Sequence, residues 1–322
     1  MALGIRTEGT MSETQRQRDL DTYRIVDSLP EEAYDDIVRL AARLCGAPVA
    51  TMSLIDRDRQ WFKSRVGIES TQTPRALAFC DHAIREPQLL MEVRDAANDP
   101  RFRDHPDVTG GLGIRFYAGM PLVTPHGTAV GTVCVIDHAP RTLDDTQREA
   151  LASLARIAMN LLESRRQLLE AQRAAAIQAS PSAGGEARPT SRYSVAILQL
   201  QDYAETVRRH GHRHVEQALL QCERALERLL AGGESMSRLA GGPEFVLTLE
   251  GDAADERLQA IERVGQATAV ALGTTALAAA AGSRSGTENP LAVFERADEA
   301  LTLRKSTQAG IASTDEARFA RH

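Results

Sequence analysis

In the first half of the chain, apolar and polar positions alternate first with the spacing of a helix and then with the spacing of strands. Across residues 18–43, charged residues alternate with apolar ones at helical spacing, which predicts an amphipathic helix. The runs APVATMSLID (47–56) and QWFKSRVG (60–67) predict two paired strands, and the segment 113–137 predicts two more around the turn TPHGT. Both Gly127 and Gly131 in this segment allow tight backbone turns or close packing. We therefore expect an α/β domain with antiparallel strands.

A stretch without glycine or proline covers residues 143–178 and is rich in strong helix formers. Steps of three and four residues along it trace an apolar stripe of the kind that pairs two helices in a coiled coil. The stripe runs through Leu151, Leu154, Ala158, Leu161, Arg165, Leu168, Gln172 and Ala175, with weaker polar members toward its C-terminal end. Its core members for pairing are Leu151, Leu154, Ala158, Leu161 and Leu168. The pattern predicts a helix that joins two copies of the chain into a homodimer. A lone amphipathic helix packed on its own domain is the alternative.

The second half opens after ASPSAGGEARPTSR, a segment of small residues, proline and glycine that predicts a flexible linker. The pattern then predicts a strand, two helices, a hairpin, a helix, a strand and a closing helix. These elements are expected at residues 193–200, 202–210, 214–230, 235–249, 253–266, 267–281 and 290–306. Their order is typical of a sheet covered by helices, so the fold class is α/β, or α+β, in both halves.

The predicted organisation divides the chain into successive parts. They are a flexible N-terminus (1–17), a first domain (18–165), a connecting or dimerisation helix (144–179), a linker (180–192), a second domain (193–312) and a tail (313–322). The length of 322 residues agrees with about two domains.

Composition and charge are those of an ordinary soluble protein. The net charge of -6 gives no reason to expect nucleic acid or an anionic membrane as a partner. No apolar run approaches the roughly 20 residues that span a bilayer, and the start MALGIRTEGTM lacks the apolar core of a signal peptide, so we expect a cytoplasmic protein. The four cysteines are scattered without a C-x-x-C pair, so neither a zinc site nor a disulfide framework is predicted.

Several segments of the first half together resemble one sensory family. They include RIVDSLPEEAYDDIVRLAARLCGAPVATMSLIDRDRQWFKS, FCDHAI, VRDAANDPRF and PRTLDDTQREALASLA. In this order and spacing the first half resembles a GAF domain of the bacterial kind that precedes signalling output domains. The resemblance implies a domain that binds a small ligand, a cyclic nucleotide or a chromophore, or that serves only as a dimerisation unit. The fold alone does not choose among these roles.

Candidate ligand-binding residues of the first domain lie on a predicted helix start and on the later strands. They are Cys80, His82, Arg115, Tyr117, Cys134 and Asp137. Thiols and a neutral imidazole are good ligands for soft metals, which makes a redox or metal-sensing site one interpretation. Free cysteines that pack like small apolar residues, beside a structural histidine, are the other. No metal and no cofactor are predicted, and the identity of a small-molecule ligand is left open.

The stretch RLAGGPEFVLTLEG (238–251) marks the second domain. Together with HGH (210–212) and ADEALTLRK (297–305), it resembles a degenerate GGDEF domain, the output module of diguanylate cyclases, over about residues 191–312. The residues of the altered motif are Gly241, Gly242, Pro243, Glu244 and Phe245. In the family, carboxylates at the third motif position and on the first strand hold the metal that activates the attacking hydroxyl.

The resemblance implies that both parts of this chemistry are lost. The metal positions fall on Pro243, Gln199 and Gln201, and the guanine-reading positions fall on Val207 and Arg208. We therefore expect a chain that is no enzyme: a regulatory protein with a GAF sensory domain and an inactive GGDEF-like domain that binds a ligand or a signalling protein partner. A residually active diguanylate cyclase that makes cyclic di-GMP from GTP, or a nucleotide receptor without turnover, are the alternatives.

Overall fold

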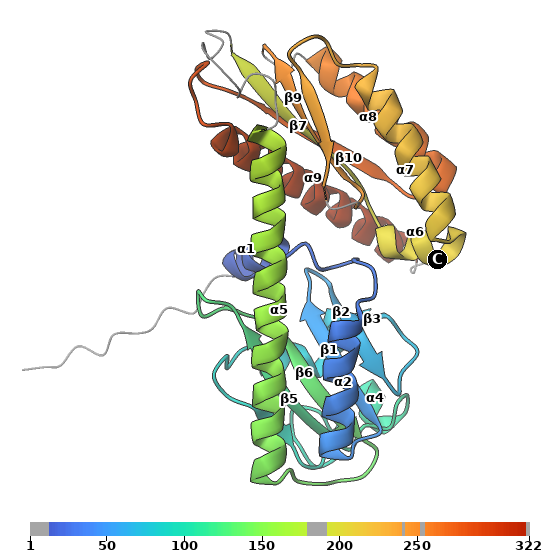
Figure 1. Cartoon of the computed structure of the whole chain (residues 1–322). Coiled ribbons are helices and arrows are strands. Elements are labelled where there is room, and N and C mark those ends of the chain that lie inside the picture. Colours follow the sequence, from blue (N-terminus) through green and yellow to red (C-terminus); the bar gives the residue numbers. More distant parts are fainter. Residues whose placement is uncertain (1–12, 179–191, 240–241, 252–254, 320–322) are drawn as a thin grey trace, which may run out of the picture. The chain divides into compact units, whose positions relative to one another are not determined.

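The computed structural model describes residues 13–178, 192–239, 242–251 and 255–319. The chain divides into two compact units, residues 1–166 and 167–322. Each unit contains an antiparallel sheet covered by helices, so the predicted mixed α/β fold is confirmed (Figure 1). Among the described residues, no helix is both long enough and apolar enough to cross a membrane.

The first unit is built on an antiparallel sheet with the strand order β3-β2-β1-β6-β5-β4. Its strands are β1 (Val49–Ile55), β2 (Arg59–Val66), β3 (Gln72–Pro74), β4 (Met91–Val93), β5 (Phe116–Val123) and β6 (Ala129–Asp137). Its helices are α1 (Glu13–Thr22), α2 (Glu32–Cys45), α3 (Phe79–Ala83), α4 (Pro106–Thr109) and the first part of α5 (Asp145–Gln178), with a short 3-10 turn at Arg75–Leu77. The four strands predicted in this half are all present.

The helix predicted over residues 18–43 is instead two helices, and this prediction is corrected. Arg24 and Asp27 have positive φ angles of 47° and 60°, which a continuous helix cannot contain. Pro30 disfavours helical backbone at the residue before it, so α2 begins only at Glu32. Residues 13–17, which we placed in a flexible N-terminus, form the first half of α1.

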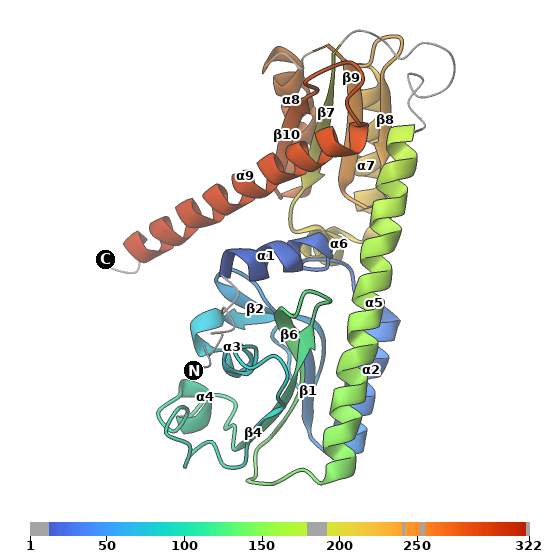
Figure 2. The same cartoon turned by 90° about the vertical axis from the view of Figure 1, so that its left-hand side faces the viewer.

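Helices cover one face of the first sheet, and short helices and loops cover the other. Figure 2 shows α2 and α5 on one side of β1 and β6, with α3 and α4 on the opposite side. The core between the sheet and the long helices contains Leu151, Leu154 and Ala158 of α5, at most 5% exposed. These members of the predicted dimer stripe pack on their own domain, so they are not available to a second helix. The lone-helix alternative describes this part of α5.

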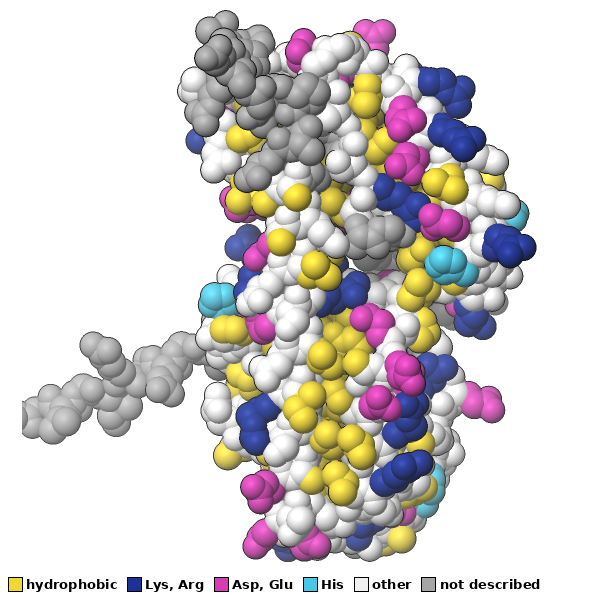
Figure 3. Space-filling model, in the orientation of Figure 1, with side chains coloured by type: hydrophobic (Ala, Val, Ile, Leu, Met, Phe, Trp, Pro, Cys, Tyr) yellow, Lys and Arg dark blue, Asp and Glu magenta, His cyan; other side chains and the backbone are white. Residues whose placement is uncertain are grey.

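Further along the predicted stripe the side chains become more exposed. Leu161 is half-buried against the same core, and Leu168 is 58% exposed. Figure 3 shows hydrophobic side chains gathered over α2 and α5 of the first unit. The exposed large ones on these helices there are Leu40, Leu44 and Ile157.

The second unit contains a sheet with the strand order β10-β7-β9-β8. Its strands are β7 (Tyr193–Leu200), β8 (Ser235–Arg238), β9 (Glu244–Glu250) and β10 (Ala276–Gly282), and its helices are α6 (Tyr203–His210), α7 (His212–Glu227), α8 (Asp255–Leu272) and α9 (Pro290–Phe319). One apolar cluster joins the sheet to α7 and α8, and a second joins its other face to α9. The predicted order of elements is present.

Two elements of the second unit differ from their predictions. The closing helix expected at residues 290–306 is α9, which continues to Phe319 and so includes part of the predicted tail. The run at 267–281 is not a single strand, because α8 continues to Leu272 and β10 begins only at Ala276. Gly273 separates the two with a φ of 62°, the left-handed conformation that commonly ends a helix. The alanines of this run are compatible with either element, so its composition did not locate the break.

Candidate functional site

A cluster of thiols and hydroxyls lies inside the first unit, between the central strands and α3. Its members, which we call the thiol–hydroxyl cluster, are Thr51, Ser53, Cys80, Tyr117, Thr132 and Cys134, each at most 1% exposed. The cluster forms because side chains at alternate positions of β1 and of β6 share one face of the sheet, and Thr51 pairs with Cys134 as Ser53 pairs with Thr132.

The two thiols are direct neighbours in this cluster. The Sγ atoms of Cys80 and Cys134 are 3.9 Å apart. The hydroxyls of Ser53 and Tyr117 donate hydrogen bonds to Cys80 Sγ at 3.2 and 3.3 Å, and Thr51 Oγ1 is 3.1 Å from Cys134 Sγ. The cluster therefore supplies donors to Cys80 from two strands.

Glycine and aromatic residues hold this arrangement in place. A Cβ atom at Gly119 would overlap the Tyr117 hydroxyl, so glycine leaves the space through which that hydroxyl reaches Cys80. Helix α3, which carries Cys80, is anchored by Phe79, whose ring stacks on Phe102 with centroids 4.1 Å apart. Both the hydroxyl and the thiol are thus positioned by packing.

The surroundings shift the two thiol pKa values in opposite directions. Burial disfavours the Cys80 thiolate, but the hydrogen bonds from Cys134, Ser53 and the neighbouring hydroxyls outweigh it and lower the pKa of Cys80. The hydrogen bond to Cys80, followed by burial, raises the pKa of Cys134. Cys80 is therefore the thiol of the pair that ionises first.

The other predicted ligand residues lie outside the cluster. His82 packs edge-on against Phe102, with ring centroids 4.9 Å apart, and burial lowers its pKa. The remaining two form ion pairs: Arg115 with Asp95 and Asp137 with Arg141. Within the part of the chain that the structure describes, no group of three or more His, Cys, Asp or Glu residues is arranged to hold a metal ion.

Sequence reasoning found the two cysteines and Tyr117 but missed the hydroxyl residues around them. The signal was present, because Thr51 and Ser53 occupy alternate positions in an otherwise apolar strand, as Thr132 and Cys134 do. Polar residues with this spacing share one face of a sheet.

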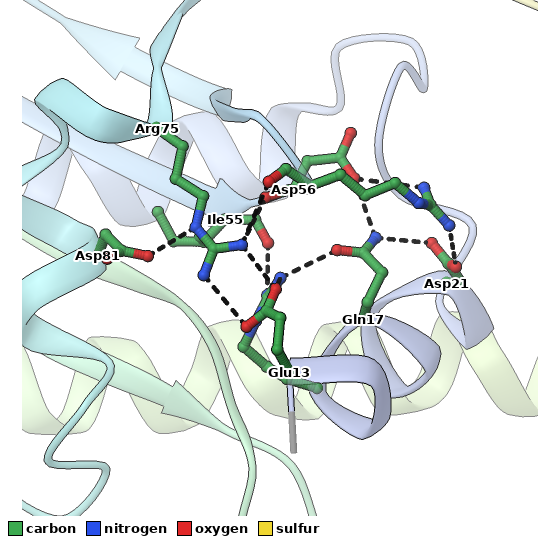
Figure 4. A network of polar contacts seen from close by, with 9 residues as sticks. Glu13, Gln17, Asp21, Ile55, Asp56, Arg75 and Asp81 are labelled. Atoms are coloured by element: carbon green, nitrogen blue, oxygen red, sulfur yellow. Dashed lines mark hydrogen bonds and ion pairs between the residues drawn. The ribbon is translucent and has the colours of Figure 1, made fainter. Parts of the chain in front are cut away.

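A polar network next to this cluster attaches α1 to the rest of the first unit (Figure 4). Arg75 forms ion pairs with Glu13 of α1 and with Asp81 of α3, at 2.6 and 2.7 Å. Arg16 donates a hydrogen bond to the carbonyl oxygen of Ile55 at the end of β1. Burial opposes ionisation of Glu13, but its hydrogen bonds with Arg16 and Arg75 lower its pKa to about 2.

The predicted motif of the second unit lies at the β8–β9 hairpin. Gly241 is outside the described residues, and the Gly242 N–H donates to the carbonyl oxygen of Leu239 at 2.8 Å. The carbonyl oxygen of Pro243 accepts a hydrogen bond from the Leu200 N–H of β7. Pro243 immediately precedes β9, which begins at Glu244, and proline is tolerated at the start of a strand. Phe245 is fully buried in the core.

An arginine links this hairpin to α7. Both terminal nitrogens of Arg238 donate to the Glu216 carboxylate, at 2.7 and 2.9 Å, and its Nε donates to the carbonyl oxygen of Gly242 at 2.7 Å. The side chain of Arg238 is only 7% exposed. Its hydrogen bonds lower the pKa of Glu216. The resemblance did not identify this pair, because it compares single positions and not contacts between them.

Glu244 of the motif also forms an ion pair. Its carboxylate is 3.4 Å from Arg173, in the last turns of α5, and is 8% exposed. The Arg173 guanidinium also lies 5.0 Å from the ring centroid of Phe294. Glu244 is thus held by the end of the long helix.

The four positions predicted to have lost their metal or guanine contacts are Gln199, Gln201, Val207 and Arg208, and each lies among neighbouring residues of the second unit. Gln199 pairs with Glu244 across β7 and β9, and its Oε1 is buried without a hydrogen-bond partner among the described residues. Gln201 follows the end of β7 and donates to the Gln199 carbonyl oxygen. On α6, Val207 packs against the core, whereas Arg208 forms an exposed ion pair one helical turn back.

Comparison with known proteins identifies the first unit. A family model described as GAF domain matches residues 29–162. The first unit contains a GAF domain. The fold of the GAF domain, a six-stranded antiparallel sheet between helices, agrees with that expected from the sequence.

One curated relative is 40% identical over 148 residues and is named "Cyclic di-GMP phosphodiesterase PA2567", from Pseudomonas aeruginosa. The match covers 46% of this chain and about a quarter (25%) of the relative. The relative is named for a catalysed reaction, and this finding corrects our expectation that the chain is no enzyme.

Solved structures resemble parts of this chain only loosely. The GAF domain of an Acinetobacter phosphoenolpyruvate-protein phosphotransferase is 17% identical, with a TM-score of 0.36, and covers 49% of this chain and 97% of that one. The GGDEF domain of DgcB from Caulobacter crescentus, in complex with c-di-GMP, is 20% identical, with a TM-score of 0.32, and covers 45% and 84%. At these TM-scores neither resemblance supports a conclusion about function.

Proposed function

We propose that this chain is a regulatory protein of cyclic di-GMP signalling, with a GAF sensory domain followed by a GGDEF-like domain. The observation that carries this proposal is the 40% identity, over 148 residues, with a protein named as a cyclic di-GMP phosphodiesterase. The GAF family match supports a sensory role for the first unit.

The second unit supplies the guanine-nucleotide part of the proposal. Its element order and its Gly-Gly-Pro-Glu-Phe sequence resemble those expected of a GGDEF-like domain, which supports this part of the proposal. Gln199, Gln201 and Pro243 offer no carboxylate to a metal ion, and magnesium prefers oxygen ligands that include carboxylates. We therefore assign this unit the binding of a guanine nucleotide or of a signalling protein partner.

Helix α5 is the element that connects sensing to output. It contributes Leu151 and Ala158 to the core of the GAF domain, and Arg173 to the ion pair with Glu244 in the second unit. A ligand that changes how α5 packs would therefore alter contacts in both units, which is a shift between populations of conformations.

We also propose that the chain forms a homodimer through the exposed apolar side chains of α2 and α5. Leu40, Leu44 and Ile157 are 45 to 51% exposed in the first unit. Leu168 lies about three helical turns beyond Ile157 on α5 and is 58% exposed. This face replaces the predicted stripe, whose first members are buried in the monomer.

The nucleotide proposal is tested with the purified full chain. Calorimetry measures binding of cyclic di-GMP and of GTP, and chromatography of the same mixtures with magnesium measures their consumption. Binding, or turnover of either nucleotide, would support the proposal, and turnover would show that the chain is an enzyme. If neither nucleotide binds or is consumed, a role of this chain in handling cyclic di-GMP is wrong.

A matched pair of variants locates the nucleotide. Arg238→Ala removes the buried link between the hairpin and α7, whereas Arg208→Ala removes an arginine that is exposed on α6. We expect Arg238→Ala to weaken nucleotide binding at least tenfold and Arg208→Ala to change it less than twofold. Equal effects would place the nucleotide away from the hairpin.

A further inference from the structure

We propose that Cys80 and Cys134 form a reversible disulfide inside the GAF domain when the protein meets a peroxide. Their sulfur atoms are 3.9 Å apart and face one another across the sheet–helix core. A disulfide bond is about 2.05 Å long, so the sulfurs must approach by roughly 1.9 Å. The residues belong to α3 and β6, far apart in sequence, so the link would join the short helix to the central sheet.

The pair is buried, but hydroxyl groups and not only apolar side chains surround it. The thiolate is the nucleophilic form of cysteine, and hydrogen-bond donors stabilise it. Cys80 accepts hydrogen bonds from Ser53 and Tyr117, and Gly119 leaves space for the tyrosine hydroxyl. The other two cysteines are also buried and free, but burial raises the pKa of both Cys45 and Cys222.

The chemistry balances with a peroxide as the oxidant. The Cys80 thiolate attacks one peroxide oxygen, an S–O bond forms, the O–O bond breaks, and hydroxide leaves and takes up a proton to become water. The Cys134 thiol then attacks the sulfenic sulfur of Cys80, the S–S bond forms, and a second water leaves. The two thiols lose two electrons and two protons, and hydrogen peroxide is reduced to two water molecules.

The position of α3 gives this bond a route to the rest of the domain. Asp81 follows Cys80 and is bound to Arg75, which holds Glu13 of α1 (Figure 4). A movement of Cys80 toward Cys134 therefore displaces a residue of this network. We expect faster hydrogen exchange of α1 amides in the oxidised protein.

The test counts thiols in the full chain. Fully reduced protein is treated with hydrogen peroxide, denatured, alkylated and weighed by mass spectrometry. We expect four alkylated cysteines before oxidation and two after it, with Cys80 and Cys134 in one linked peptide. A reductant should restore four. Four free thiols after peroxide, over-oxidation without a link, or a link between other cysteines would overturn the proposal.

Variants of the same four cysteines provide the controls. Cys80→Ser should keep all its remaining thiols, and Cys134→Ser should lose only the Cys80 thiol, to a sulfenic acid without a link. Cys45→Ser and Cys222→Ser should still lose two thiols to the linked pair. The peptide map of the unmodified chain needs no variant, so the proposal stays testable if a serine variant does not fold.

Tyr117→Phe tests the positioning role of the hydroxyl. Loss of one donor to Cys80 should make the oxidation several-fold slower near neutral pH and move the midpoint of its pH profile upward. An unchanged midpoint would show that the tyrosine only packs against the thiol.

Discussion

Gly131 is the position where a single methyl group tests the architecture of the GAF domain most severely. It lies on β6 and pairs with Leu54 on β1 and with Leu122 on β5. A Cβ atom here would overlap the carbonyl oxygen of Ser53 and lie 3.0 Å from the Leu54 Cα. Both obstacles are backbone atoms of the neighbouring strand, which cannot rotate away as a side chain can.

The expected cost of Gly131→Ala follows from this geometry. Overpacking a close-packed core costs about 1–3 kcal/mol, and obstruction by backbone puts this site near the upper value, about 3 kcal/mol. Gly127→Ala is the matched control, because Gly127 has a φ of 84° in a turn where no atom lies within 4 Å of the added Cβ. Its cost is conformational only, about 1–2 kcal/mol.

Urea unfolding followed by tryptophan fluorescence measures the change in the free energy of unfolding of each variant. The chain has one tryptophan, Trp61, which is 8% exposed in the core of the first unit, so its emission reports on that unit. We expect a clearly larger loss of unfolding free energy for Gly131→Ala than for Gly127→Ala. If Gly131→Ala is within about 0.5 kcal/mol of the wild type, the close approach of β6 to β1 is wrong.

Three further predictions concern the second unit, the N-terminal helix and the dimer. Arg238→Ala removes two charge-assisted hydrogen bonds to the partly exposed Glu216 carboxylate, so unfolding of the second unit, followed by circular dichroism, should cost about 2–3 kcal/mol less free energy. The Trp61 fluorescence transition, which reports on the first unit, should not change, and a shift of that transition would contradict the prediction. The pKa of Glu13 is lowered to about 2, so its ion pairs stabilise the fold above about pH 4.5 and lose this effect as the pH falls toward 2. The difference in unfolding free energy between wild type and Glu13→Gln should therefore vanish between pH 4.5 and 2. Light scattering should give twice the chain mass of 35.0 kDa for the wild type and one chain mass for Ile157→Glu. The control Leu89→Glu, at a side chain 58% exposed outside α2 and α5, should stay dimeric. A monomeric wild type would refute the dimer.

The sequence was most informative where one period dominates a long segment. The central strands follow from β-branched and apolar runs, and the element order of the second unit follows from its turns and helical spacing. The break after Thr22 and the end of α8 at Leu272 were missed, because backbone conformations of single residues decide them.

The candidate site was predictable only in part, for a related reason. Cys80 and Cys134 could be named from their residue type, but their separation of 3.9 Å depends on how α3 packs on β6. His82 was grouped with them because it is near Cys80 in sequence, yet its ring packs against Phe102. The coiled-coil spacing at Leu151 and Leu154 is equally compatible with packing on a sheet, and sequence spacing alone does not choose the partner.

Titration of the full chain with cyclic di-GMP, followed by chromatography of the nucleotide, tests the central claim most directly. The account predicts saturable binding that Arg238→Ala weakens at least tenfold, or consumption of the nucleotide by the chain. Cyclic di-GMP that is recovered unchanged, with no heat of binding, would contradict it.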